Sequence, residues 1–209
     1  MKKTLTIFAA VIAAAIALAG CSADTGSGSS DASSTPAVNP SSSGTSSSSA
    51  PAASAQFNDA DTMFAQLMIP HHAQAVTMSE TMLKKEDLPA TVTDLATKIK
   101  AAQGPEIEKM TSWLQSWGQP TQMPTDMASG HSMSGMVSED DMAKLESAQS
   151  TEAAKLFLIQ MIAHHEGAVA MAKTETTDGK NAHAVQLSKD IVSSQETEIH
   201  EMKHLLATL

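Results

Sequence analysis

A stretch of fifteen residues that occurs twice decides the fold. Residues 64–78 read FAQLMIPHHAQAVTM and residues 157–171 read FLIQMIAHHEGAVAM, and eight of the fifteen aligned positions are identical. A shorter match follows each copy, because QGPEIEKM at 103–110 aligns with QETEIHEM at 195–202. The offset between the copies changes only from 93 to 92 residues. We therefore interpret the chain as an internal duplication in which each half buries its apolar face against the other.

Each half is predicted to hold two long helices, from its capping residues, first-turn proline and terminating glycines. These helices run from Asn58 or Asp59 to about Glu86, from Pro89 to Trp117, from near Thr151 to Asp178 and from Asn181 almost to Leu209, with a short helix opening at Ser138. Four long helices without alternating segments predict an all-α fold, a four-helix bundle built from a duplicated two-helix unit. The bundle covers residues 57–209, with halves 57–118 and 151–209 and a Met/His-rich connector, 119–150.

Histidines fall inside the apolar face of the first helix of each half. At 100° per residue, one arc of the first helix contains Phe64, Met68, His71, Ala75, Met78 and Met82. The corresponding arc of the third helix contains Phe157, Met161, His164, Ala168 and Met171. The second histidine of each pair, His72 and His165, lies on the edge of its arc. Glu166 lies opposite the arc, which argues against a partnership with His164.

A carboxylate interrupts the apolar face of the second helix of each half. Glu106 lies among Leu95, Ile99, Met110 and Trp113, and Glu198 lies in the same way among Leu187, Ile191, Met202 and Leu205. A carboxylate in an apolar stripe is costly unless a partner compensates it. We therefore expect two inward couples, His71 with Glu106 and His164 with Glu198.

The polar core admits two interpretations. The couples can be satisfied polar pairs, with the methionines as flexible core filler. Alternatively they bind a metal: thioether and imidazole together suit Cu(I), imidazole also accepts Cu(II), and carboxylate with imidazole alone suits iron, manganese or zinc. The repetition of the pattern favours the metal, with copper as the predicted cofactor. The candidate ligands are Met68, His71, His72, Met78, Glu106, Met110, Met161, His164, His165, Met171, Glu198 and Met202.

The connector carries soft ligands outside the predicted core, which favours copper over iron. Its candidate auxiliary ligands are Met123, Met127, His131, Met133 and Met136. His200 and His204, one turn apart on the last helix, are a further auxiliary candidate together with Glu196 or Glu201, with a solvated polar face as the alternative. His183 has no evident partner and is interpreted as a surface residue.

The N-terminus is predicted to be a targeting segment. Residues 1–20 have the two lysines, apolar run and small residues of a signal peptide. They lead to Leu18-Ala19-Gly20-Cys21, which resembles the bacterial lipobox, and Cys21 is the only cysteine in the chain. Residues 21–56, lipidated at Cys21, are rich in Ser, Ala and Gly and are predicted to form a disordered tether. The predicted location is extracytoplasmic, on a bacterial membrane through acyl chains alone.

Composition excludes several function classes. The chain has 209 residues, a formal net charge of -10 and no arginine, which makes nucleic acid an unlikely partner because phosphate binding needs basic groups. A single cysteine excludes intrachain disulfides and zinc sites built from several cysteines. Methionine, with fourteen residues, is far above its usual share.

The repeated Met-Ile-x-His-His-x-x-Ala-Val-x-Met, followed by Gln-x-x-Glu-Ile-x-x-Met, resembles the family called domain of unknown function 305. The likeness covers about residues 57–209. It implies a ferritin-like four-helix bundle, often secreted or lipid-anchored, with some members that bind copper and are linked to copper tolerance. The family's paired histidines correspond to His71, His72, His164 and His165, and its following methionines to Met78 and Met171. The family's Glu-Gly after the histidines is present at 166–167 but is Ala73-Gln74 in the first half, and Gly104-Pro105 also departs from its usual helix-forming residues.

Three functions are consistent with these features. The first is a lipid-anchored protein that binds copper and sequesters it, or relays it to a copper-handling protein, without catalytic turnover. The second is a dimetal carboxylate oxidase that uses His71, His164, Glu106 and Glu198, although the chain has one Glu-x-x-His motif, Glu201 to His204, where such bundles have two. The third is a metal-free scaffold that binds a partner protein.

Overall fold

A computed structural model describes residues 56–123 and 133–209 as a bundle of helices, with no strand in these two ranges. The helices are α1 (Asp59–Leu83), α2 (Ala90–Ser116), α4 (Glu139–Ser147), α5 (Ser150–Asp178) and α6 (Ala182–Thr208). The predicted all-α fold and its four long helices are confirmed, and α1 ends at Leu83 rather than near Glu86. The signal peptide, Cys21 and nearly all of the tether lie outside the described residues, as do Met127 and His131.

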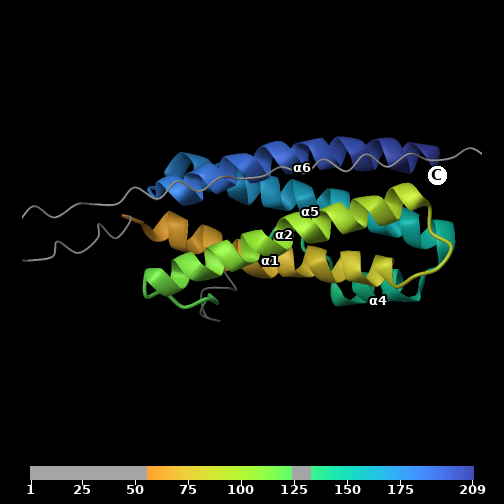
Figure 1. The fold of residues 1–209 in the computed structure, drawn as a ribbon, viewed down its shortest axis with the longest axis horizontal. Coiled ribbons are helices and arrows are strands. Elements are labelled where there is room, and N and C mark those ends of the chain that lie inside the picture. The colour runs from red at the N-terminus through yellow and green to blue at the C-terminus, as the bar shows by residue number, and fades with distance from the viewer. Residues whose placement is uncertain (1–55, 124–132) are drawn as a thin grey trace, which may run out of the picture. The chain divides into compact units, whose positions relative to one another are not determined.

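The four long helices form two antiparallel hairpins, α1 with α2 and α5 with α6 (Figure 1). The hairpins meet mainly through α1 and α5, whereas α2 and α6 contact each other sparsely. The short helix α4 lies against α1 and α5. The two helices that carry the His-His pairs are therefore the central helices, and the middle of the molecule is formed where they face each other.

The apolar core consists of two clusters. One contains Met78, Met161 and Met202 with Leu95, Ile99 and Phe157. The other contains Met68 and Met110 with Phe64, Leu114 and Ile191, and Met171 packs against it. Along α1 the histidines lie between Met68 of one cluster and Ala75 of the other, and α5 repeats this arrangement in reverse. A polar layer thus separates two apolar cores. Each large apolar side chain that is fully buried in either core stabilises the folded state by about 1.5–3 kcal/mol.

Hydrogen bonds fix the start of α1 to the turn between α5 and α6. Asn58 and Asp61 form a capping box, in which each side chain accepts a hydrogen bond from the other's backbone N–H. Asp61, fully buried, also accepts from the backbone N–H groups of Lys180, at 3.1 Å, and Asn181, at 2.8 Å. The side chain of Asn58 donates to the carbonyl of Asp178 at 2.8 Å. The two halves are therefore joined at one end of the bundle by a polar clasp.

The end of α2 depends on a glycine. Gly118 has a φ of +68°, a left-handed conformation that glycine adopts without a Cβ penalty. Its N–H donates to the carbonyl of Gln115 and that of Gln119 to Leu114, which is the hydrogen-bond pattern of a Schellman motif. The predicted stop after Trp117 is confirmed.

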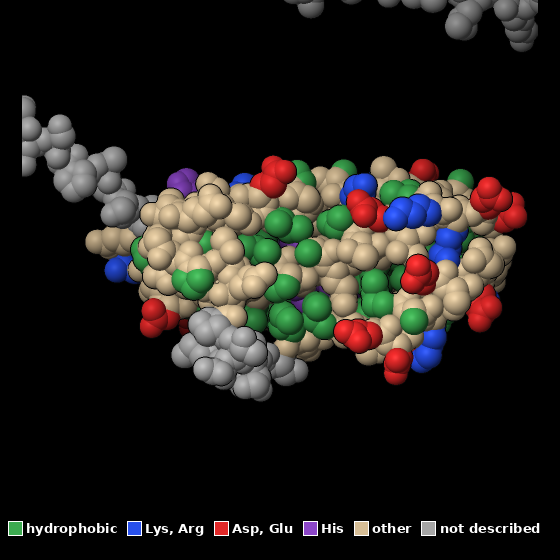
Figure 2. Space-filling model, turned by 90° about the horizontal axis from the view of Figure 1, so that it is seen from below, with side chains coloured by type: hydrophobic (Ala, Val, Ile, Leu, Met, Phe, Trp, Pro, Cys, Tyr) green, Lys and Arg blue, Asp and Glu red, His purple; other side chains and the backbone are tan. Residues whose placement is uncertain are grey.

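Charged side chains lie mainly toward the rim of the face in Figure 2, and hydrophobic side chains gather along its middle. Two large hydrophobic side chains of the described ranges are exposed, Leu83 and Ile159. No described helix combines the length and apolarity that crossing a bilayer requires.

Candidate metal centre

The outer histidine of each pair is hydrogen-bonded to the carboxylate of the neighbouring hairpin helix. His72 Nε2 lies 2.8 Å from Glu106 Oε2, and His165 Nε2 lies 2.7 Å from Glu198 Oε2. Both histidines are fully buried, and the glutamates keep about a fifth of their side-chain surface exposed (20% and 19%). The structure therefore contains two equivalent imidazole–carboxylate couples, one in each half.

These couples correct the sequence prediction, which paired the carboxylates with His71 and His164. The helical projection treated each helix as having one buried arc. In the structure α1 contacts both α2 and α5, so its buried surface is wider than that arc. The side of α1 that the projection placed on the edge faces α2, which brings His72 to Glu106.

The inner histidines face each other where α1 and α5 meet. The ring centroids of His71 and His164 are 3.7 Å apart, with the planes tilted by 39°. Burial, opposed by a hydrogen bond to the Ser134 carbonyl, lowers the pKa of His71 to about 4. Burial and then the nearby His71 lower the pKa of His164 to about 2. Both rings are therefore neutral at physiological pH, the state in which imidazole binds metals.

Hydrogen bonding leaves the same nitrogen free on three of the four rings. Nε2 of His72 and His165 is placed to donate to a carboxylate, and Nε2 of His71 is placed to donate to the carbonyl of Ser134 at 3.1 Å. In the neutral form of each ring this assignment makes Nδ1 the unprotonated nitrogen, and each Nδ1 is buried without a hydrogen-bond partner among the described residues. Within the described part of the chain, neither ring nitrogen of His164 has a hydrogen-bond partner.

Buried nitrogens without partners are costly in an ordinary core and are common where an ion or ligand binds. Metal-binding histidines usually donate their other ring N–H to a carboxylate or a backbone carbonyl, as His71, His72 and His165 do. The donor set of this polar layer therefore fits a metal ion that accepts imidazole.

The six candidate methionines divide into two groups of three, one in each apolar cluster. Met78, Met161 and Met202 belong to the first cluster, and Met68 and Met110 belong to the second, with Met171 packed against it. Each of these methionines corresponds in the repeat to a methionine of the other group: Met68 to Met161, Met78 to Met171 and Met110 to Met202. All are fully buried except Met171, which is half-buried. The polar layer therefore has a thioether group on each side.

Residues 134–137 of the connector contact α1 and α5 beside the inner histidines. Gly135 lies against the backbone of α5, where an added Cβ would collide with the carbonyl of Ala163, and an added Cβ on Gly167 would collide with the carbonyl of Ser134. The side chain of Gln74 on α1 donates to the carbonyl of Val137 and accepts from its N–H, both at 2.8 Å. In the second half, Gly167 thus leaves room for the backbone of the connector. In the first half, the amide of Gln74 forms hydrogen bonds with it.

Sequence reasoning noted Gln74 and Gly167 only as a departure of one half from the family pattern, and it missed Ser134 and Gly135. The signal was available, since Gln74 and Gly167 occupy corresponding positions of the repeat and differ in size. Met133 and Met136, beside this contact, are half-buried. Met133 also lines a hollow of about 450 Å³ with Met123 and Pro70.

The remaining candidates lie apart from the polar layer. His200 and His204 are exposed on α6, and Glu166 is exposed and accepts a hydrogen bond from Lys203, away from His164 as expected. Within residues 56–123 and 133–209, no three side chains among His, Cys, Asp and Glu come together to hold a metal. An ion held at this layer by more than two protein ligands would therefore need a donor of another type, such as thioether sulfur.

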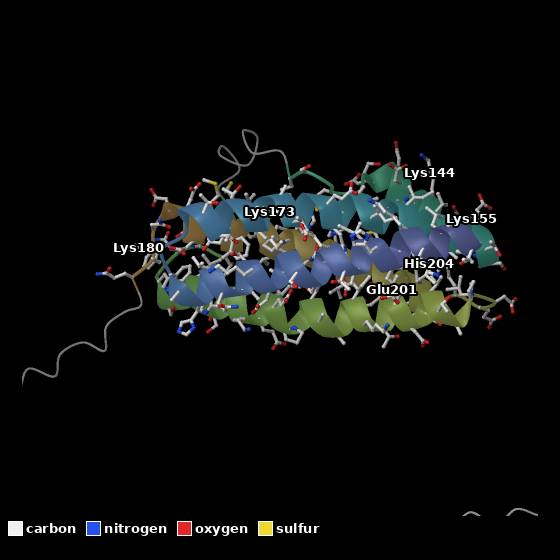
Figure 3. The ribbon with its side chains drawn as sticks, turned by 90° about the horizontal axis from the view of Figure 1, so that it is seen from above. Lys144, Lys155, Lys173, Lys180, Glu201 and His204 are labelled. Carbon is white, nitrogen blue, oxygen red and sulfur yellow. The ribbon has the colours of Figure 1, made fainter. Side chains whose placement is uncertain are left out.

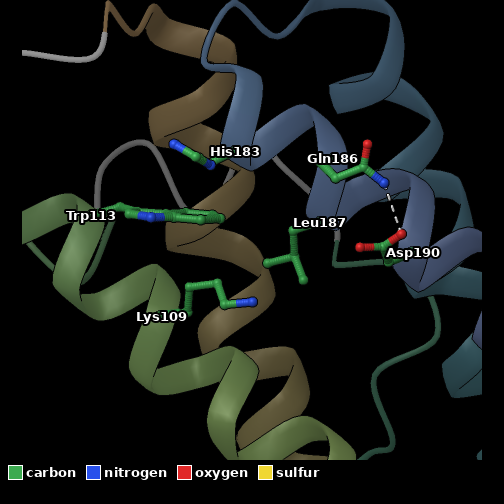
Figure 4. A pocket seen from close by; sticks show the side chains of 6 residues that line it. All are labelled: Lys109, Trp113, His183, Gln186, Leu187 and Asp190. Atoms are coloured by element: carbon green, nitrogen blue, oxygen red, sulfur yellow. Dashed lines mark hydrogen bonds between the residues drawn. The ribbon is translucent and has the colours of Figure 1, made fainter. Parts of the chain in front are cut away.

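A second hollow, of about 380 Å³, lies between α2 and α6 where these helices contact sparsely (Figure 4). Trp113 and Lys109 line it from α2, and His183 and Asp190 line it from α6. Gln186 donates to Asp190 at 2.9 Å. His183 is exposed, as expected for a surface residue.

Fold and site together define a class: a duplicated helical hairpin bundle with a buried layer of histidines between two groups of methionines. The family described as domain of unknown function, DUF305, matches residues 61–206. The chain belongs to the DUF305 family.

Solved structures of this family are similar to the chain along most of its length. A DUF305 protein from Streptomyces coelicolor, assigned as secreted, is 34% identical with a TM-score of 0.67, over 71% of this chain and 93% of that one. A DUF305 fragment from Deinococcus radiodurans is 34% identical with a TM-score of 0.65, over 73% of this chain and 98% of that one.

The protein CopM in its Cu(I)-bound form is 31% identical to the chain, with a TM-score of 0.60, over 71% of this chain and 96% of CopM. CopM has also been solved with Cu(II) and with silver. A protein similar to the chain in fold and sequence has therefore been solved with copper and with silver bound. A search of the curated proteins finds no match to the chain.

Proposed function

We propose that this protein binds copper outside the cytoplasm and sequesters or relays it, without catalytic turnover. The observation that carries the proposal is the polar layer: four buried imidazoles, three of them held through Nε2 so that Nδ1 is free. Thioethers on both sides of the layer favour Cu(I), because soft ligands select that ion, while imidazole also accepts Cu(II). The copper-bound forms of CopM support the same assignment.

The imidazoles of His71, His72, His164 and His165 and the thioethers of the two methionine groups are the proposed ligands. Glu106 and Glu198 are proposed to orient the outer rings rather than to bind the ion, because each already accepts from a histidine. The metal is cargo in this proposal, and the protein's part is to present neutral nitrogen and sulfur in a water-poor layer.

The dimetal oxidase has weaker support. It requires carboxylates that converge on the ions, whereas Glu106 and Glu198 are each directed to a histidine of their own hairpin.

Cu(I) competition against a chromophoric chelator tests the proposal. The full chain, purified in detergent, is expected to withdraw Cu(I) from the chelator, and His71→Ala with His164→Ala is expected to weaken this at least tenfold. His183→Ala is the matched control, because His183 is exposed and lies apart from the layer. Unchanged affinity in the double variant, with a normal helical spectrum, would remove the layer from the proposal.

We further propose that Cys21 is lipidated and anchors the protein to a bacterial membrane, because the only cysteine ends a lipobox-like sequence. Cell fractionation tests this. The wild-type protein is expected in the membrane fraction and Cys21→Ser in the soluble fraction or with its signal peptide retained. A Cys21→Ser protein that is processed and membrane-bound like the wild type would disprove the anchor.

A further inference from the structure

The outward ridge of α6 carries two histidines that the polar layer does not use. His200 and His204 are one turn apart, and both are exposed. Side chains at i and i+4 of a helix lie one above the other, about 5–6 Å apart at Cβ. Glu201 follows His200, so the segment reads His-Glu-x-x-His, a spacing with which two histidines on one helix face hold a metal ion. Figure 3 labels Glu201 and His204 on this part of α6.

The charged side chains around the ridge are engaged elsewhere. Three ion pairs flank it: Glu196 with Lys173 at 2.8 Å, Lys203 with Glu166 at 3.0 Å, and Glu201 with Lys98 at 3.5 Å. The first two are directed to α5 and the third to α2. The imidazoles of His200 and His204 make no hydrogen bond within the described part of the chain. They are therefore left free, with paired charges on both sides.

Packing does not explain the two histidines. The offset of 92 places Glu108 and Ser112 at the corresponding positions of α2, and both are exposed. The inward positions of the same turn are kept, since Met202 corresponds to Met110. The second half has thus acquired an imidazole pair only at outward positions, where a core residue is not required.

We propose that His200 and His204 chelate one Cu(II) ion at the surface, with water completing its coordination. Imidazole is a favoured ligand of Cu(II), and Cu(II) binds a given nitrogen site more tightly than Ni(II) or Zn(II). The site differs from the polar layer in its place on the outer surface and in having imidazole without thioether, so it does not depend on the proposed function.

Peptidase chemistry, for which this spacing is also known, does not fit the surroundings. Glu201 would have to serve as the general base, but it pairs with Lys98. None of the described hollows is lined by His200 or His204. The pairing of Glu201 and the position of the ridge outside these hollows therefore argue against a peptidase site.

Cu(II) titration of the full chain, followed by electron paramagnetic resonance, tests the site. The wild type is expected to bind one equivalent with nitrogen hyperfine structure that His200→Ala and His204→Ala each remove, because a single imidazole should bind at least tenfold more weakly. His183→Ala, which removes an exposed histidine from the same helix, is expected to leave the signal unchanged. An unchanged spectrum and affinity in both single variants would overturn the proposal.

The same experiment separates this site from the polar layer. His72→Gln with His165→Gln is expected to keep the surface Cu(II) signal, and His200→Ala with His204→Ala is expected to keep the Cu(I) affinity. Loss of the surface signal in the His72 and His165 double variant alone would assign that Cu(II) to the layer and overturn the surface chelate.

Discussion

The two halves of the bundle have the same contacts at the outer histidines of the polar layer, but they differ at the inner histidines. His72–Glu106 and His165–Glu198 have nearly the same hydrogen-bond length, 2.8 and 2.7 Å. The inner rings are not equivalent, because His71 Nε2 contacts the carbonyl of Ser134, whereas neither ring nitrogen of His164 has a hydrogen-bond partner among residues 56–123 and 133–209. The connector causes this difference, since only one copy of it exists. Duplication thus accounts for the symmetric set of histidines and glutamates, and the contact with the connector makes one half distinct from the other.

The largest expected effect tests whether the methionine groups are equivalent. Met68→Ala and Met161→Ala each empty a fully buried position in a different apolar cluster. Each is expected to lower the free energy of unfolding by about 2–5 kcal/mol. Urea denaturation of the metal-free variants measures this. A loss in one half alone would show that the two cores are not equivalent.

The next effect tests the connector. Gly167→Ala places a Cβ against the carbonyl of Ser134 and should lower stability by about 1–3 kcal/mol, as overpacking does. The corresponding change in the first half, Gln74→Ala, removes two hydrogen bonds to Val137 and should cost about 1–2 kcal/mol. Gly104→Ala is the control, because a Cβ there meets open space. Gly167→Ala no more costly than Gly104→Ala would contradict the contact.

The inner histidines should titrate separately in the metal-free protein. The folded-state pKa of His71 is about 4 and that of His164 about 2, against 6.5 when unfolded. Because the unfolded chain binds more protons, stability should fall as pH drops below about 6.5, with a slope of about 1.4 kcal/mol per pH unit for each histidine. Proton NMR should detect His71 titrating first. The reverse order would contradict the hydrogen bond to Ser134.

Glu175 on α5, whose carboxyl neighbours that of Asp61 in the clasp, should give the opposite pH dependence. Burial and then the neighbouring carboxyl of Asp61 raise the pKa of Glu175 from 4.5 to about 8. The folded protein then holds a proton that the unfolded chain has lost, so the contribution of Glu175 to stability should fall as pH rises from 4.5 to 8. With the histidines, this places the greatest stability near pH 6.5, about where the slopes change sign. Glu175→Gln should abolish the alkaline fall, and a persistent fall would assign it elsewhere.

The smallest expected effect tests the symmetry of the outer couples. Glu106→Gln and Glu198→Gln each keep a hydrogen-bond acceptor for the histidine but remove the negative charge of the carboxylate. Each is expected to lower the free energy of unfolding by about 1 kcal/mol. The two changes should also weaken Cu(I) binding equally, because the couples have the same geometry. Denaturation and chelator competition measure both quantities. A difference of more than tenfold between their effects on Cu(I) affinity would place the ion nearer one half.

Much of this architecture could be predicted from local sequence. The caps at Asn58 and Asn181, the stop after Trp117 and the burial of His71 and His164 depend on residues within a few turns. The partner of Glu106 could not be predicted, because it depends on which helices α1 packs against. A helical projection of α1 alone assumes one buried face, whereas α1 packs against both α2 and α5. The contact of Gly135 with Gly167 is also long-range. The sequence indicated this contact only through the difference in side-chain size between Gln74 and Gly167, which occupy corresponding positions of the repeat.

The central claim is that imidazole and thioether groups of the polar layer bind the same copper ion. X-ray absorption at the copper edge of the Cu(I)-loaded full chain tests it most directly. The account predicts both nitrogen and sulfur ligands in the wild type, and loss of the nitrogen contribution in a variant with all four layer histidines replaced by glutamine. Copper bound by sulfur alone in the wild type, or an unchanged spectrum in that variant, would contradict it.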